Sequence, residues 1–214
     1  SYRYSGTALT PSFTVSLNGV KLVQDLDYSV TYLSNKNVGT AKLVICGKGV
    51  YTNSLTKTFT IRPETMASAV ITGCKAKYSY TGKQVKPLIQ VVWNGKILRN
   101  NTDYTLLYKN NKKRGSAGIV VTGKGNYSGT LTASFTIVRA SVKKTSVTGL
   151  KAVYARNGKV VKPKVTVKLG GKKLKKKRDY ILSYRKNKKK GTALLYVKGV
   201  GNYSGTKKMK FKIR

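Results

Sequence analysis

One motif recurs three times along this chain of 214 residues, at a constant spacing of 76 residues. An Asp-Tyr pair marks the spacing most clearly, with its aspartates at Asp27, Asp103 and Asp179. Prolines, glycines, further tyrosines and a closing Phe-x-Ile motif recur in the same register without a gap. Because a fixed period of this length is typical of tandem structural units, the chain is three copies of one module.

Each module has the pattern of an all-β domain, because apolar residues alternate with polar ones and no segment has a helical period. In the first copy Phe13, Val15 and Leu17 alternate with Ser and Thr. Dipeptides that tolerate positive φ follow this strand and predict two-residue hairpin turns at Asn18-Gly19, Asn94-Gly95 and Gly170-Gly171. We therefore expect six or seven short strands per module, packed as a small Ig-like β-sandwich of two sheets.

The period divides the chain into module one (1–62), module two (63–139) and module three (140–214). Module two has a leading strand at about Ala69 to Thr72, and module one lacks the corresponding segment. We therefore expect the chain to be part of a longer array. The joints lack Gly or Ser runs, which favours a stiff, rod-like arrangement of the modules.

The composition argues against most catalytic chemistry. The chain has no His, only 5 acidic residues and 2 cysteines, Cys46 and Cys74, without CxxC spacing. General acid and base catalysis at neutral pH and transition-metal binding depend on those residue types. We therefore expect no enzymatic activity, no cofactor and no metal site, and we expect both thiols to be free.

Charge is the feature in which the copies differ. Module one has 7 basic and 2 acidic residues, module two 12 and 2, and module three 25 and 1, giving net charges of +5, +10 and +24. The lysines added in module three fall at predicted solvent positions of strands and in two turns that flank one strand. A solvated, soluble face is the alternative to polyanion binding. The candidate polyanion-binding residues are Lys164, Lys168, Lys172, Lys173, Lys175, Lys176, Lys177, Arg178, Arg185, Lys186, Lys188, Lys189, Lys190, Lys208, Lys210 and Lys212.

Module two contains a series of short motifs: Asn94-Gly95-Lys96, Asp103-Tyr104, Tyr108 to Asn111, Gly123 to Gly129 and Phe135 to Ile137. Module three adds Gly191-Thr192-Ala193. Together these motifs resemble the tandem Ig-like repeats of large surface proteins of Gram-positive gut bacteria, and the resemblance extends over all three modules. It implies an extracellular array, anchored at the bacterial cell surface by parts outside this chain and used for display, spacing or adhesion, without catalytic residues.

The Asp-Tyr pairs have two interpretations. In the structural one, the Asp bonds backbone N–H groups of the preceding turn and the Tyr anchors its strand. In the other, a buried Asp assists a self-catalysed Lys to Asn isopeptide bond, as in some Gram-positive surface modules. The glycine-rich segments at 123–129 and 199–205 are interpreted as turns, because they lead into strand sequence and not into a helix that could bind phosphate.

The sequence favours a non-enzymatic extracellular spacer and adhesin whose third module contacts anionic cell-wall polymer or acidic host glycans such as mucin. Lysines outnumber arginines 35 to 9, which favours diffuse attraction over bidentate recognition. A second hypothesis is binding of a secreted host protein, such as immunoglobulin, through an apolar patch or an exposed sheet edge of module two. The candidate patch residues, at predicted outward positions, are Leu88, Val92 and Leu107. Nonspecific nucleic-acid binding is the third. No segment is apolar enough for a membrane span.

Overall fold

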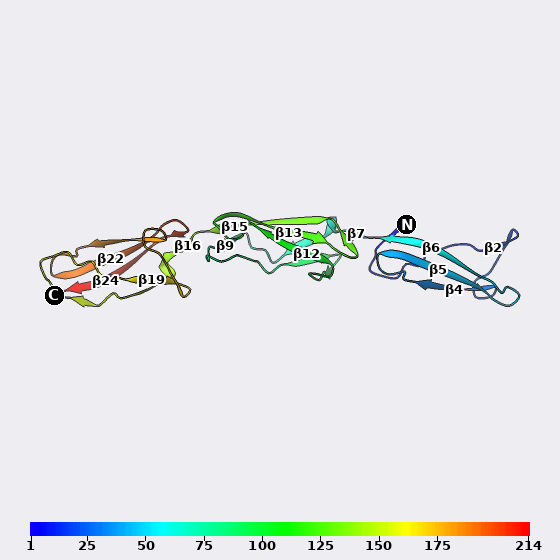
Figure 1. Ribbon diagram of the computed structural model, residues 1–214, viewed down its shortest axis with the longest axis horizontal. Helices are drawn as coiled ribbons and strands as arrows, with labels where there is room; N and C mark the ends of the chain where they lie inside the picture. The colour runs from blue at the N-terminus through cyan, green and yellow to red at the C-terminus, as the bar shows by residue number, and fades with distance from the viewer. The chain divides into compact units, whose positions relative to one another are not determined.

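A computed structural model describes residues 1–214. The regular elements of the chain are mostly β-strands (Figure 1). Two short 3-10 helices accompany them. Neither has the length and apolar character of a membrane-spanning helix. Its contacts define two compact units. The first comprises Ser1–Cys74, Leu88–Tyr108 and Ile119–Ala133, and the second Lys75–Pro87, Lys109–Gly118 and Ser134–Arg214. These borders fall inside module two, and the module boundaries and the rod-like arrangement stay predictions.

Each module has a four-stranded sheet. In module one its order is β1-β6-β5-β4, and the three long antiparallel strands lie side by side in Figure 1. The short first strand pairs in parallel with the last one. The strands are β1 (Tyr2–Arg3), β4 (Tyr28–Leu33), β5 (Gly39–Gly47) and β6 (Ser54–Arg62). The copies are β9 (Lys77–Ser79), β12 (Tyr104–Lys109), β13 (Gly115–Gly123) and β15 (Thr130–Val138), then β18 (Val153–Tyr154), β21 (Tyr180–Arg185), β22 (Gly191–Gly199) and β24 (Thr206–Ile213).

A smaller sheet accompanies each four-stranded sheet. It has two strands in module one and three in modules two and three, where the leading strand adds to it. The strands are β2 (Ser16–Leu17) and β3 (Val20–Lys21), then β8 (Val70–Thr72), β10 (Gln90–Trp93) and β11 (Lys96–Ile97), then β17 (Ser146–Thr148), β19 (Thr166–Leu169) and β20 (Lys172–Lys173).

The predicted hairpin turns are confirmed. Asn18 and Gly19 have φ values of 49° and 82°, and the equivalent dipeptides of the other modules are also left-handed at both positions. Two-residue turns with positive φ at both positions match the right-handed twist of the strands that they join. Asn-Gly and Gly-Gly therefore occur at these turns because they tolerate positive φ at both positions, as the sequence indicates.

Two parallel strand pairs form where one module follows another. β7 (Glu64–Thr65) pairs with β14 (Tyr127–Ser128), and β16 (Ala140–Ser141) pairs with β23 (Tyr203–Ser204). Each linker then enters a 3-10 helix, η1 (Met66–Ser68) or η2 (Val142–Lys144). The buried side chains of Met66 and Val142 fix these helices, because both are fully enclosed.

The core of module three lies between its two sheets. Val167 of β19 packs in one cluster with Tyr180 of β21 and Val197 of β22. Ala193, Leu195, Phe211 and Ile213 extend that core along the four-stranded sheet. Burying one face of each sheet against the other makes a β-sandwich, which confirms the predicted all-β sandwich fold.

Candidate polyanion-binding surface

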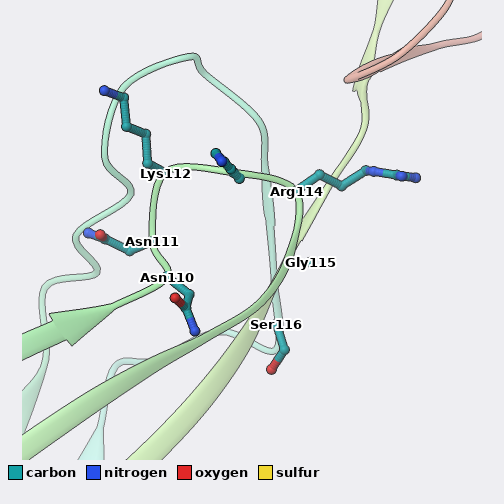
Figure 2. A pocket seen from close by; sticks show the side chains of 7 residues that line it. Asn110, Asn111, Lys112, Arg114, Gly115 and Ser116 are labelled. Carbon is teal, nitrogen blue, oxygen red and sulfur yellow. The ribbon is translucent and has the colours of Figure 1, made fainter.

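The loop that joins the edge strand of the four-stranded sheet to its neighbour, β12 to β13 in module two, has the same framework in all three modules. In module two it runs from Asn110 to Ser116 and encloses an open hollow of about 530 Å³ (Figure 2). Asn111 is buried and donates from Nδ2 to the carbonyl of Val85 at 2.9 Å, and the N–H of Val85 donates back to the carbonyl of Asn111 at 2.7 Å. The same exchange occurs between Asn35 and Leu9 and between Asn187 and Val161.

The cations in these loops lie on that fixed framework. Figure 2 shows the side chains of Lys112 and Arg114 pointing away from each other, outward from the loop. In module three the loop has Lys186, Lys188, Lys189 and Lys190, all exposed, around a hollow of about 520 Å³. The module-one loop has only Lys36 at these positions. The charge therefore changes between modules while the loop geometry is kept.

A row of lysines covers one strand of module three. Lys208, Lys210 and Lys212 of β24 are exposed, and they alternate with inward residues such as Phe211 and Ile213. Neighbouring lysines on one face of a strand are about 7 Å apart, because each residue adds about 3.4 Å. Across the sheet, Lys210 is paired in register with Leu194, which is paired in turn with Arg185 of β21. The Arg185 guanidinium carbon lies 5.7 Å from the ring centre of Tyr196.

A second group of cations lies on the smaller sheet of module three. Lys168 of β19 and Lys173 of β20 are directly opposite each other and both exposed. Because Val167 beside Lys168 points into the core, the outer face of this sheet is on the opposite side of the module from the β24 lysines. Lys164 is exposed just before β19, and Lys172 opens β20.

The turn from 175 to 178 contains the remaining candidates, and one of them is already paired. Arg178 donates from Nε and Nη2 to the two carboxylate oxygens of Asp179 at 2.9 and 2.8 Å. That pairing holds the pKa of the Asp179 carboxyl below its ordinary value. Lys175, Lys176 and Lys177 are exposed. Arg178 therefore neutralises an internal acid, and the other three offer free charge.

The candidate cations thus surround module three. They lie on the outer faces of both sheets and in the turns at each end of β21. The module's one acidic side chain, Asp179, is buried at 5% exposure. Every exposed charged side chain of module three is therefore positive, and an anion can approach from many directions.

The proposed apolar patch of module two is not on one sheet. Val92 lies at the centre of the β11-β10-β8 sheet, opposite Val70 on one side and Ile97 on the other. Leu107 belongs to β12 of the four-stranded sheet, and Leu88 precedes β10 at 94% exposure. The apolar row that the structure offers is therefore Val70, Val92 and Ile97. Module three has Ser146, Lys168 and Lys173 in the equivalent register.

The structure bears out the structural interpretation of the Asp-Tyr pairs. Oδ2 of Asp27, Asp103 and Asp179 accepts a hydrogen bond of 2.7 to 2.8 Å from the backbone N–H four residues earlier. The following tyrosines are buried in the cores. No lysine is buried, so none is enclosed as the isopeptide interpretation requires. The glycine-rich segments contain turns and the short strands β14 and β23, and they lead into the strands β15 and β24 and not into a helix, as predicted.

The cysteines and acids form no reactive cluster. Cys46 is exposed, Cys74 is half-buried, and no disulfide joins them. Burial raises the pKa of the Cys74 thiol, which disfavours the reactive thiolate. No group of three or more His, Cys, Asp or Glu side chains is placed to hold a metal ion.

One feature was missed from the sequence. A cavity of about 530 Å³ opens beside β16, where module two is followed by module three. Tyr80, Tyr203 and Leu169 line it together with four cations, Lys83, Arg139, Lys144 and Lys172. A comparison of the repeats could have indicated this cavity, because module three has the smaller residues Leu169 and Gly170 where module two has Trp93 and Asn94.

Comparisons with known proteins identify no family for this chain. No protein-family model matches it, and no curated protein matches it. Among solved structures, the protocadherin gammaB7 EC3-6 cis-dimer matches with 10% sequence identity and a TM-score of 0.22, over 99% of this chain and 71% of that chain. A TM-score this low supports no conclusion about function.

Proposed function

We propose that the chain is a non-enzymatic, extracellular repeat array of a bacterial surface protein, a spacer and adhesin whose module three contacts anionic polymers or acidic glycans. The observation that carries the proposal is that three modules with the same scaffold differ strongly in net charge. Module three has a net charge of +24, and its one acid is buried and bonded to Arg178. A field of one sign attracts polyanions over roughly a Debye length, about 8 Å at physiological salt.

Two lysines support a role for this charge beyond solubility. Lys177 and Lys186 have φ values of 69° and 55°, in the left-handed region. Module two has Asn101 and Asn110 at these positions, with φ values of 68° and 53°. Asn tolerates this conformation better than Lys, so lysine is used at some cost in stability. Selection for exposed charge explains such a replacement.

The extracellular setting rests on the resemblance to Gram-positive surface repeats, and the partner class rests on the charge. Anionic cell-wall polymer and acidic host glycans such as mucin share the same repeated negative charge. The test is retention of the full chain on immobilised heparin, sulfated mucin and lipoteichoic acid, with neutral dextran as control, over a salt gradient. Retention on all three polyanions that falls with salt supports the proposal. Equal retention on dextran contradicts it.

A second candidate function is binding of a secreted host protein such as immunoglobulin through module two. The row of Val70, Val92 and Ile97 favours it, because two of these side chains are more than half exposed on one sheet face. Apolar association persists at high salt, whereas charge-driven association fades. Binding of immunoglobulin that survives high salt and is lost in Val92→Lys, the module-three residue, would support this function. Binding that Val92→Lys leaves unchanged would contradict it.

A further inference from the structure

We infer that the cavity beside β16 is a binding site for an acidic sugar, one ring or two, with a carboxylate or sulfate group. This inference rests on the proposed function and names a specific site within it. The cavity volume of about 530 Å³ lies within the range of small-ligand sites, roughly 300 to 1,000 Å³. It is lined by residues of the second compact unit only.

The walls of the cavity suit a sugar ring. The Tyr80 and Tyr203 rings meet edge to face, with centroids 5.7 Å apart, and Leu169 packs against the same cluster. Tyrosine offers an apolar face and a polar tip, so it can pack on the C–H face of a sugar while its hydroxyl meets the ring hydroxyls. Ser79, Thr81 and Ser141 add further hydroxyl groups to the lining.

The charge of the cavity selects an anion. Lys83, Arg139, Lys144 and Lys172 line it, and no acidic residue does. A hydrogen bond between a cationic donor and a carboxylate or sulfate is about twice as strong as a neutral one. All four cations are exposed and therefore hydrated when no ligand is bound. An acidic sugar is preferred because it can form ion pairs with them that a neutral sugar cannot.

The preceding joint of the same chain shows how such a cavity is closed. There Trp93 occupies the position of Leu169, and its ring lies 5.4 Å from that of Tyr127, the equivalent of Tyr203. Tyr127 also meets Tyr4, the equivalent of Tyr80, at 5.5 Å. Tyr4 is only 5% exposed, whereas Tyr80 is half-buried. Tyr203 is 3% exposed, about as enclosed as Tyr127 at 2%, so replacing Trp by Leu at one joint leaves the Tyr80 ring as the accessible aromatic surface.

The two joints also differ in charge, and this difference, like the difference in side-chain size, favours an acidic ligand at the second joint. Three cations of the cavity have uncharged equivalents at the first joint: Lys83, Arg139 and Lys144 correspond to Thr7, Pro63 and Ser68. Ala140 of the cavity corresponds to an acidic residue, Glu64. Arg3 and Lys96 are the cations of the first joint at these positions. The second joint has thus gained both space and positive charge, which is the combination that an acidic ligand needs.

The test is saturation-transfer NMR and titration of the full chain with N-acetylneuraminic acid, glucuronic acid and glucose 6-sulfate, with galactose as the neutral control. We expect at least one acidic sugar to bind and galactose not to. Leu169→Trp/Gly170→Asn, which copies the first joint without changing charge, should weaken that binding by about tenfold or more. Lys83→Thr/Lys144→Ser, at exposed positions, should also weaken it by about tenfold.

The outcomes separate this site from the wider proposal. Loss of acidic-sugar binding in the charge-neutral variant, with retention on heparin unchanged, supports the cavity as the site. The inference is overturned if both variants bind the acidic sugar as tightly as the wild type, or if the wild type binds no acidic sugar. Retention on immobilised polymers still tests the proposed function in either case. If Leu169→Trp/Gly170→Asn unfolds the chain, the Lys83→Thr/Lys144→Ser result decides.

Discussion

Asn187 and Val161 exchange two hydrogen bonds of 2.8 Å, one from Nδ2 of Asn187 to the carbonyl of Val161 and one from the N–H of Val161 to the carbonyl of Asn187. This exchange holds the lysine-rich loop of module three against the segment before β19. Because Asn111 and Asn35 make the same exchange in their modules, the loop conformation does not depend on its lysines.

Asn187→Ala should therefore destabilise the chain without changing its charge. The carbonyl of Val161 loses its side-chain donor, and we expect the free energy of unfolding to fall by about 1 to 2 kcal/mol. Urea denaturation followed by circular dichroism measures it. Lys188→Thr, at an exposed position of the same loop, is the matched control and should change stability by less than about 0.5 kcal/mol. Equal effects of the two substitutions would show that the Asn side chain does not anchor the loop.

Asp103→Ala should lower stability without selectively removing a binding activity. The substitution leaves the N–H of Arg99, now 2.8 Å from Oδ2 of Asp103, without its acceptor. The expected loss is about 1 to 3 kcal/mol. The measurement is the melting temperature of the variant beside its retention on heparin. Unchanged melting with lost retention would reverse the structural assignment of the Asp-Tyr pairs.

The lowered pKa of Asp179 predicts a loss of stability in acid. A carboxyl whose pKa is lower in the folded state contributes stability above its unfolded pKa, which is about 4, and loses that contribution as the pH falls through the folded pKa. Arg178→Thr, which copies Thr102 of module two, removes the main cause of the shift and should reduce the loss. Urea denaturation between about pH 5 and pH 2 checks this. The same acid dependence in Arg178→Thr and wild type would contradict it.

Lys177→Asn and Lys186→Asn should raise stability and weaken polyanion binding together. Each restores the residue that module two has at a left-handed position. We expect a gain of up to about 1 kcal/mol per site, with a lower salt concentration for elution from heparin. Lys176→Asn, a control outside the left-handed region, removes the same charge without the gain in stability. Destabilisation by either substitution would contradict the argument from backbone conformation.

The sequence predicted the repeated framework well because its determinants are local. Alternation such as that of Val167 and Leu169 in β19, and positive-φ pairs such as Asn94-Gly95, fix strands and turns within a few residues. In module one the alternation of Phe13 and Val15 predicts a longer strand than the structure has, because β2 covers only Ser16–Leu17. The role of Arg178 was not predictable, because its bidentate bond to Asp179 depends on how the turn folds. The parallel pairing of β7 with β14 joins residues more than sixty positions apart and has no local signature. The cavity depends on the size of one side chain, Leu169, in a packed joint.

The exposure of the candidate cations was predicted residue by residue, and so was the position of the two basic turns at the ends of one strand, but the face of the module on which each strand lysine lies was not. All sixteen cations are exposed, as alternation and turn position indicated. Lys168 and Lys210 lie on opposite sides of the module because their strands belong to different sheets. The sheet that a strand joins depends on long-range pairing, which local sequence does not show. The same reason separates Val92 from Leu107, which were expected to share one patch.

The most direct test of the account compares two triple variants of the full chain on immobilised heparin over a salt gradient. Lys208→Thr/Lys210→Thr/Lys212→Thr copies the module-one residues onto β24, and Lys42→Thr/Lys48→Thr/Lys57→Thr removes the same charge from module one. Each exposed lysine contributes on the order of 1 kcal/mol or less, so the effects should be partial. The account predicts that the module-three variant elutes at clearly lower salt than the module-one variant. Identical elution of the two variants would contradict a binding surface on module three.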